Sequence, residues 1–277
     1  MDYGKLIINL CTTGMVPVTD NCPHVPISPK EIARDVKRCY ELGVSMVHLH
    51  ARNENEAPAW EAEKYSEILS EIHHFAPEII TVVSTSGRNW SDLERRSASL
   101  HALPKPDMAS LTLGSMNFMQ QASVNSPEII KGLLRKMQQN NIVPELEVFD
   151  AGMINYAGFL IKKELLKPPY YFNLIFGSLG TAALNAVNVG ALISSLPPTA
   201  VWSMGGIGRF QLAANTIALS LGGHVRVGLE DNPYYNWRGR TYASNPQLVE
   251  RIVRIAKELN RDIATAEEAR NIIDLNG

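Results

Sequence analysis

Short apolar runs recur along the chain, and longer segments with helical periodicity separate them. The runs are the length of a strand, rich in Val, Ile, Leu or aromatic residues, and mostly continuous rather than alternating with polar positions. Continuous apolar runs are typical of parallel strands that are buried on both faces. We therefore expect eight buried strands, at residues 5–11, 44–50, 79–85, 108–114, 144–149, 170–177, 200–206 and 224–230.

A segment with helical periodicity follows each run. The clearest is 28–43, where Ser28 can cap the helix, Pro29 suits its first turn and Glu31 lies three residues after the cap. The other helices are expected at 61–74, 90–103, 126–141, 153–166, 181–196, 209–223 and 246–260, and a short helix at 265–275 follows the last of them.

Eight alternations of strand and helix predict a (β/α)8 TIM barrel, an α/β fold that occupies residues 1–277 as a single domain with a short C-terminal helix. A doubly wound open sheet is the rival architecture. That fold usually has a glycine-rich turn after its first strand, and the sequence CTTGMV at 11–16 does not match GxGxxG. The barrel is the better interpretation.

The composition narrows the class of protein. The formal net charge of −2 argues against binding to nucleic acid or to an anionic membrane, because both require clustered Lys and Arg. No apolar run approaches the roughly 20 residues that cross a bilayer, and the start MDYGKLIINL lacks the features of a signal peptide. Three cysteines without a CxxC motif fit a reduced compartment, so we expect a cytoplasmic protein.

Two histidines stand out within the second apolar run, which reads MVHLHAR. Residues i and i+2 of a strand share a face, so His48 and His50 point the same way at the strand's carboxyl end. Active sites of barrel enzymes lie at that end. Two converging imidazoles suggest a divalent metal site. The alternative is a pair of hydrogen-bonded core histidines.

The eighth run, HVRVGLEDN, offers a third ligand. Arg226, Gly228 and Glu230 alternate along it, which predicts that they share a face and that the Glu230 carboxylate reaches the same ion. An arginine that points into an apolar barrel is costly unless it is paired, so Glu230 and Asp231 suggest a charge network. The alternative is a solvated turn.

Other polar residues alternate at strand ends. Glu145 and Glu147 share a face in the fifth run, where a carboxylate is a candidate acid–base group or metal neighbour, although Glu145 could instead belong to a deeper network. Ser84, Ser86 and the backbone of Gly87 are small donors where an anion could rest, and Ser110 and Thr112 add hydroxyls at alternating positions. Glycine-rich segments at 176–181 and 205–210 precede helices and could hold phosphates.

Two histidines and one carboxylate leave coordination positions open. Such a set favours Zn2+, with Mn2+ or Fe2+ also compatible. No histidine lies between Leu103 and Gly223, which argues against a two-metal hydrolase. Polarisation of a carbonyl beside a carboxylate base is the better interpretation, and it indicates C–C bond chemistry next to a carbonyl.

Taken together, these residues resemble the β-keto acid cleavage enzymes almost from end to end. The motifs that carry the resemblance are TGMVP, VHLHAR, STSGR, NIVPELEVFDAGM, GGIGRF and GGHVRVGLEDN. The resemblance implies a Zn2+-bearing barrel, commonly a homotetramer. It also implies a reaction in which a β-keto acid and acetyl-CoA give acetoacetate and a new acyl-CoA.

The resemblance also implies a role for each site residue. His48, His50 and Glu230 match the metal ligands, and Asp231, oriented by Arg226 and Ser84, matches the base that removes the C2 proton. Glu147 matches an acidic residue that activity requires. The positions that hold the substrate carboxylate are Ser84, Gly87 and Ser110, where Ser110 replaces a threonine and keeps the hydroxyl.

The chain departs from the pattern in the first-strand loop. A family member that cleaves an amino-substituted keto acid has a carboxylate there to pair with the substrate ammonium, and this chain has Val16. Because an unpaired buried ammonium is costly, we expect an uncharged, aliphatic β-keto acid to be preferred. Two other functions remain open: a Zn2+-dependent C–C lyase or aldolase that acts without CoA, and a non-catalytic barrel with a structural metal.

Overall fold

The computed structural model describes residues 3–119 and 121–275, and its centre is a closed barrel of eight parallel strands. Around the barrel, each strand pairs with the next in chain order, and the last pairs with the first. The strands are β1 (Ile8–Cys11), β2 (Met46–Leu49), β5 (Ile80–Val83), β6 (Met108–Thr112), β9 (Val143–Val148), β10 (Tyr171–Phe176), β11 (Val201–Gly206) and β12 (His224–Val227). The (β/α)8 barrel is therefore confirmed, and every apolar run of the sequence contributes one strand.

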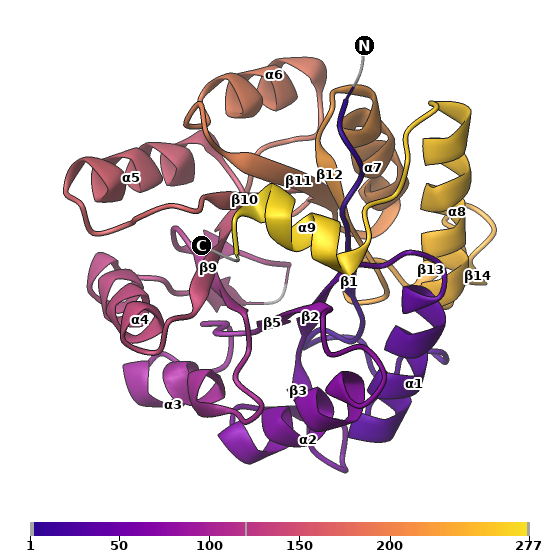
Figure 1. The fold of residues 1–277 in the computed structure, drawn as a ribbon, viewed down its shortest axis with the longest axis horizontal. Helices are drawn as coiled ribbons and strands as arrows, with labels where there is room; N and C mark the ends of the chain where they lie inside the picture. The colour runs from indigo at the N-terminus through magenta and orange to yellow at the C-terminus, as the bar shows by residue number, and fades with distance from the viewer. Residues whose placement is uncertain (1–2, 120, 276–277) are drawn as a thin grey trace.

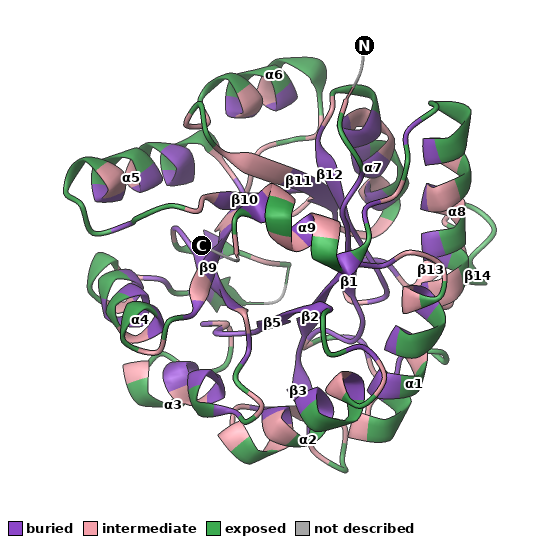
Figure 2. Ribbon diagram, in the orientation of Figure 1, coloured by how far each residue is buried: buried purple, intermediate pink, exposed green. Residues whose placement is uncertain are grey.

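Helices surround the barrel as an outer ring (Figure 1). They are α1 (Pro29–Tyr40), α2 (Ala62–His73), α3 (Leu93–Ser97), α4 (Pro127–Gln139), α5 (Ala151–Lys162), α6 (Ala186–Ser194), α7 (Gln211–Ser220) and α8 (Asn245–Glu258). Each turns buried residues towards the strands and exposed residues outwards (Figure 2). Among the helices of the described ranges, none combines the length and apolar composition that a bilayer span requires.

The first helix begins where its sequence predicted. The Ser28 hydroxyl accepts from the Glu31 backbone N–H, and the Glu31 carboxylate accepts from the Ser28 N–H, which makes the capping box complete. The expected helix at 90–103 is instead divided into α3 and the 3₁₀ turn η1 (Ala98–His101). Asp92 caps α3 by accepting from the Arg95 N–H.

The barrel's two ends are built differently. Three short hairpins leave the carboxyl ends of strands: β3 (Ala51–Arg52) with β4 (Pro58–Ala59), β7 (Met116–Asn117) with β8 (Ala122–Ser123), and β13 (Tyr234–Asn236) with β14 (Thr241–Tyr242). The amino end is covered by α9 (Ala266–Ile273), which lies across the centre of Figure 1. Ala269 and Ile273 of α9 pack there with Met46, Met108 and Tyr171. One end is thus closed, and the other remains available for a site.

Candidate active site

Two histidines and a glutamate meet at the carboxyl end of the barrel. His48 lies in β2, and His50 follows the last residue of that strand. Their Nε2 atoms are 3.3 Å apart. The Glu230 Oε1 atom lies 3.3 Å from His50 Nε2 and 4.0 Å from His48 Nε2. The structure therefore brings together the three residues that the sequence analysis assigned to a metal.

This donor set fits a divalent ion. Facing imidazole nitrogens and a carboxylate are the ligands that Zn2+ prefers, and three of them leave a position open. The second carboxylate oxygen of Glu230, Oε2, is buried without a hydrogen-bond partner among the described residues. Buried polar atoms normally have a partner. An ion between these side chains would provide one.

Glu145 holds His48 in the orientation that a metal ligand needs. Its Oε2 lies 2.7 Å from His48 Nδ1, which leaves Nε2 directed at the cluster. Its Oε1 accepts from the Asn9 side chain at 2.7 Å and from the Asn173 side chain at 3.2 Å. Glu145 is thus part of the deeper network that the sequence left as an alternative.

The two asparagines of this network were missed by the sequence analysis. Asn9 and Asn173 are fully buried and lie within the otherwise apolar strands β1 and β10. An amide in a continuous apolar run was the signal that could have identified them, because a buried polar group requires a specific partner.

Arg226 joins three carboxylates next to the histidines. Its Nε donates to Asp231 at 2.8 Å, and its Nη2 donates to Glu230 at 2.7 Å. Its Nη1 lies 3.4 Å from Glu147, whose other oxygen accepts from the Thr112 hydroxyl at 2.7 Å. The predicted charge network is present, and EDN is not a solvated turn: Asp231 is only 6% exposed.

Burial and charge shift the site's pKa values in opposite directions. Burial lowers the pKa of His48, but the carboxylates of Glu145 and Glu230 outweigh it and raise that pKa to about 9. Burial would raise the pKa of Glu230, but His50 and Arg226 hold it well below its usual range. Burial also raises the pKa of Asp231, and Arg226 opposes that shift without cancelling it. Asp231 is therefore the better proton acceptor of the two adjacent carboxylates.

Glu230 reaches the cluster from a turn, so the prediction that it shares a strand face with Arg226 and Gly228 is wrong. Strand β12 ends at Val227, and Gly228 adopts φ +156°. A Cβ on Gly228 would lie 2.0 Å from the Cys11 carbonyl oxygen. The chain therefore bends at Gly228, and the Glu230 N–H donates to the same Cys11 oxygen at 3.2 Å.

The loop after β5 and strand β6 supply the small polar groups that were expected to hold an anion. The Ser84 hydroxyl accepts from the Ser86 N–H at 3.2 Å, and the Ser110 hydroxyl accepts from the Thr85 N–H at 3.1 Å. Each hydroxyl keeps its proton to donate. Among the described residues, Ser84 forms no hydrogen bond with Asp231. Gly87 lies against the Arg96 guanidinium, which a Cβ at that position would approach to 2.7 Å.

The first-strand loop reaches the site through Gly14 and Met15. Gly14 has φ +67°, and a Cβ there would lie 2.5 Å from Glu230 Cγ. Arg52 fixes the loop by donating to the carbonyl oxygens of Gly14 at 2.8 Å and Pro17 at 2.6 Å. Val16 is half exposed. The side chain beside His50 is instead Met15, in a small pocket that also includes Trp60, Tyr65, Ser84 and Trp90.

The two glycine-rich segments differ from the expectation. Segment 176–181 does not lead into a helix, because α6 begins at Ala186 with Asn185 as its cap. Segment 205–210 leads through the 3₁₀ turn η2 (Gly208–Phe210) into α7. There the Gly208 N–H donates to the Asp231 carbonyl at 2.7 Å, so this backbone supports the active-site turn.

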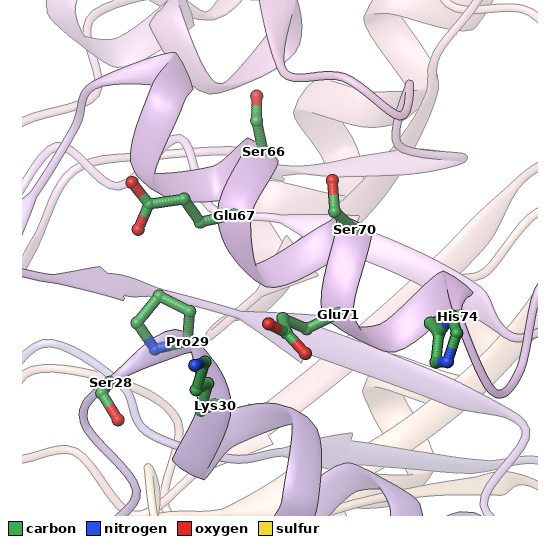
Figure 3. Close-up of a pocket in the computed structure, with 8 residues that line it drawn as sticks. All are labelled: Ser28, Pro29, Lys30, Ser66, Glu67, Ser70, Glu71 and His74. Carbon is green, nitrogen blue, oxygen red and sulfur yellow. The ribbon is translucent and has the colours of Figure 1, made fainter.

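A wider surface hollow lies apart from these groups, between α1 and α2 (Figure 3). Its lining comes from the start of α1 and the outer face of α2: Ser28, Pro29, Lys30, Ser66, Glu67, Ser70, Glu71 and His74. None of these residues belongs to the cluster of histidines and carboxylates. The candidate active site is therefore the cluster at the barrel mouth.

Several known proteins are similar to this chain. The model of the beta-keto acid cleavage enzyme family matches residues 5–275. The chain is 37% identical to a 3-keto-5-aminohexanoate cleavage enzyme of Fusobacterium nucleatum over 98% of both chains. It is 34% identical to a 3-oxoadipate:acetyl-CoA acetyltransferase of Cupriavidus necator, over 97% of this chain and 94% of that one. A ternary complex of ObcA with a C4-CoA adduct and oxalate shares the fold, with a TM-score of 0.79 at 22% identity, over 91% of this chain and 68% of that chain.

Proposed function

We propose that this chain, which belongs to the beta-keto acid cleavage enzyme family, is a Zn2+-dependent acyltransferase. It would convert a β-keto acid and acetyl-CoA into acetoacetate and a new acyl-CoA. The observation that carries the proposal is the meeting of His48, His50 and Glu230 next to the Arg226–Asp231 pair. The names of relatives at 34–37% identity, which describe keto acid cleavage and acetyl-CoA transfer, support the reaction class.

His48, His50 and Glu230 would hold the ion. When bound, Zn2+ would act as a Lewis acid on the ketone carbonyl of the substrate. The chain's own contribution is to fix the ligands, since Glu145 orients His48 and Arg226 orients Glu230. Helix α9 packs on the amino end of the barrel, opposite this site.

Asp231 would remove the C2 proton of the β-keto acid. Its carboxylate is buried and fixed by the Arg226 Nε at 2.8 Å, and its raised pKa suits a base. The C2 carbanion attacks the acetyl thioester, a C–C bond forms, and the CoA thiolate leaves. The thiolate then attacks the original ketone carbon and the C2–C3 bond breaks, which releases acyl-CoA and acetoacetate after the proton returns to C2. Glu147, with a pKa raised by burial, would carry protons within the site.

We expect an uncharged, aliphatic acyl chain to be preferred. Met15 lies beside His50, and Val16 offers no carboxylate to an ammonium group. We expect kcat/KM for 3-oxohexanoate to exceed that for 3-keto-5-aminohexanoate by at least about 10-fold, the effect of leaving one charge unpaired. Equal kcat/KM values for the two acids would contradict this specificity.

The decisive experiment is a panel of β-keto acids assayed for acetoacetate release with and without acetyl-CoA, on protein of measured zinc content. The proposal requires release that depends on acetyl-CoA and is lost after metal removal. Cleavage that proceeds without acetyl-CoA would instead identify a C–C lyase or aldolase. If Mn2+ or Fe2+ but not Zn2+ restored acetoacetate release, the metal would be reassigned and the proposed reaction would stand.

We also propose a homotetramer, the assembly that the resemblance implies. Light scattering coupled to size exclusion should give four times the chain mass of 30.6 kDa. A monomer with full activity would show that the site needs no neighbouring chain.

A further inference from the structure

One guanidinium at the barrel mouth, that of Arg88, has no polar partner among the residues that the structure describes. Arg88 follows Gly87 in the loop after β5, and its side chain is partly buried. Its Nε is buried without a hydrogen-bond partner, and the described residues form neither a hydrogen bond nor an ion pair with its guanidinium. A buried guanidinium normally has acceptors, because desolvating an unpaired cation is costly.

The other buried arginines around the site have such acceptors. Arg226 contacts three carboxylates. Arg96 donates to the Thr85 carbonyl, the Val124 carbonyl and the Asn125 side chain at 2.7–3.1 Å. Arg52 donates to backbone carbonyls of the first loop. Arg88 therefore differs from its neighbours, since its donors are left available.

An aromatic ring holds Arg88 in place. The guanidinium carbon lies 4.0 Å from the centre of the Phe118 ring, which follows β7 in the hairpin after β6. Phe118 in turn packs edge-on against Phe149, at 5.9 Å between ring centres. Stacking on a ring orients a guanidinium without using its N–H groups. Arg88 is thus fixed and still able to donate.

The charges around the mouth indicate what it would bind. Glu230, Glu147 and Asp231 lie close enough to oppose the lowering of the Arg88 pKa by burial, yet none pairs with it. A β-keto acid is itself an anion and must approach these three carboxylates, whereas Arg226 is already occupied by them. Ser84, Gly87 and Ser110 offer only neutral donors. Arg88, next in the chain to Gly87, is a cation whose side-chain donors the described residues leave unused.

We propose that Arg88 pairs with the C1 carboxylate of the β-keto acid and selects the free acid over neutral ketones and esters. The inference rests on the proposed function for its substrate class. A guanidinium can donate two parallel hydrogen bonds to a carboxylate. It adds charge to a site that otherwise holds the acid through hydroxyl and backbone groups.

The test compares binding of acetoacetate with binding of its methyl ester, by calorimetry on zinc-loaded protein without CoA. Wild type should bind the acid more tightly than the ester. Arg88→Gln should weaken acetoacetate binding about 10- to 100-fold, the worth of one charge-assisted hydrogen-bond pair. Arg88→Gln should leave ester binding unchanged. The acetoacetate affinity of Arg88→Lys should lie between those of wild type and Arg88→Gln. Arg209→Gln is the matched control, because Arg209 also stacks on a phenylalanine, at 4.9 Å from Phe210, but is exposed.

Three outcomes would overturn the assignment. Equal weakening of acid and ester would show that Arg88 only supports the loop. Loss confined to a dicarboxylic substrate such as 3-oxoadipate would place Arg88 at the far end of the acyl chain. Unchanged affinities for the acid and the ester would show that Arg88 is not part of the binding site. Because binding is measured without acetyl-CoA, an Arg88-dependent preference for the acid can stand even if the transfer reaction is absent.

Discussion

The same eight strands form both ends of the barrel, but the two ends bury different kinds of side chain. At the carboxyl end, Arg226, Asp231 and the two histidines are buried, the Glu230 side chain is 14% exposed, and one of its carboxylate oxygens has no partner among the described residues. At the amino end, Ile273 and its neighbours on α9 pack against apolar strand residues. Buried ion pairs add little net stability, whereas apolar burial is the main stabilising term. The apolar amino end contributes to stability, and the charged carboxyl end holds the candidate active site.

The largest effect should follow loss of a metal ligand. Glu230→Ala should remove zinc and lower kcat/KM about 10⁴-fold, because a Lewis acid supplies several kcal/mol of transition-state stabilisation. Zinc content by mass spectrometry and the acetoacetate assay check both parts. Full activity of the zinc-free variant would show that the metal is not needed for catalysis. The thermal midpoint should change little relative to metal-free wild type, since Glu230 belongs to neither apolar core cluster.

A smaller loss of activity is expected when the proposed base, Asp231, is replaced. Asp231→Asn should lower kcat about 10²- to 10³-fold while zinc content stays at the wild-type value, because general-base catalysis is worth that much. The enzyme-catalysed exchange of the acetoacetate C2 protons with deuterium, followed by NMR without CoA, should slow by a similar factor. Unchanged exchange would assign proton removal to another group, with Glu147 the nearest candidate.

A substitution at the amino end of the barrel should lower stability and leave the catalytic rate unchanged. Ile273 is 1% exposed, so Ile273→Ala should lower the free energy of unfolding by about 2–4 kcal/mol through lost burial and a cavity. Zinc content and kcat should remain at wild-type values in the folded fraction. The control is Leu259→Ala, since Leu259 is 44% exposed and its loss should cost less than about 0.5 kcal/mol. A fall in kcat with unchanged stability would contradict the division between the ends.

The smallest effect concerns a histidine at the amino end. His224 accepts from the Ile7 N–H at 3.0 Å, and burial, aided by Arg261, lowers its pKa to about 3. The unfolded chain, with a histidine pKa near 6.5, binds more protons, so stability is full above that pH and is lost as the pH falls towards 3. Wild type should lose roughly 2 kcal/mol more than His224→Gln between pH 7 and pH 5. Parallel pH profiles of unfolding would contradict this cause.

Much of the fold could be predicted because buried parallel strands are apolar on both faces. Each run then reads as a continuous block, and helices with capping residues such as Ser28 lie between. The convergence of His48 and His50 followed from strand periodicity. The path of Glu230 did not, because it depends on the approach of Gly228 to the Cys11 carbonyl, a contact between distant parts of the chain.

Two further features could not be predicted, because they also depend on contacts between distant parts of the chain. The isolation of Arg88 depends on which acceptors the folded loops bring near it, and the sequence shows only an arginine after a glycine. Likewise, Met15 and Val16 are adjacent, and only the loop fixed by Arg52 decides which of them lies beside His50. Local pattern predicts elements, whereas pairing between loops requires coordinates.

The contact of Gly14 with Glu230 has a consequence for altering this protein's preferences. The peptide that presents Met15 and Val16 rests directly on an ion-binding side chain, with no room for a methyl group between them. Redesign of that segment for larger or charged acyl chains would shift the ion's surroundings unless residue 14 stays glycine. Selectivity and metal retention would therefore evolve together here, and libraries that vary this loop should be screened for both.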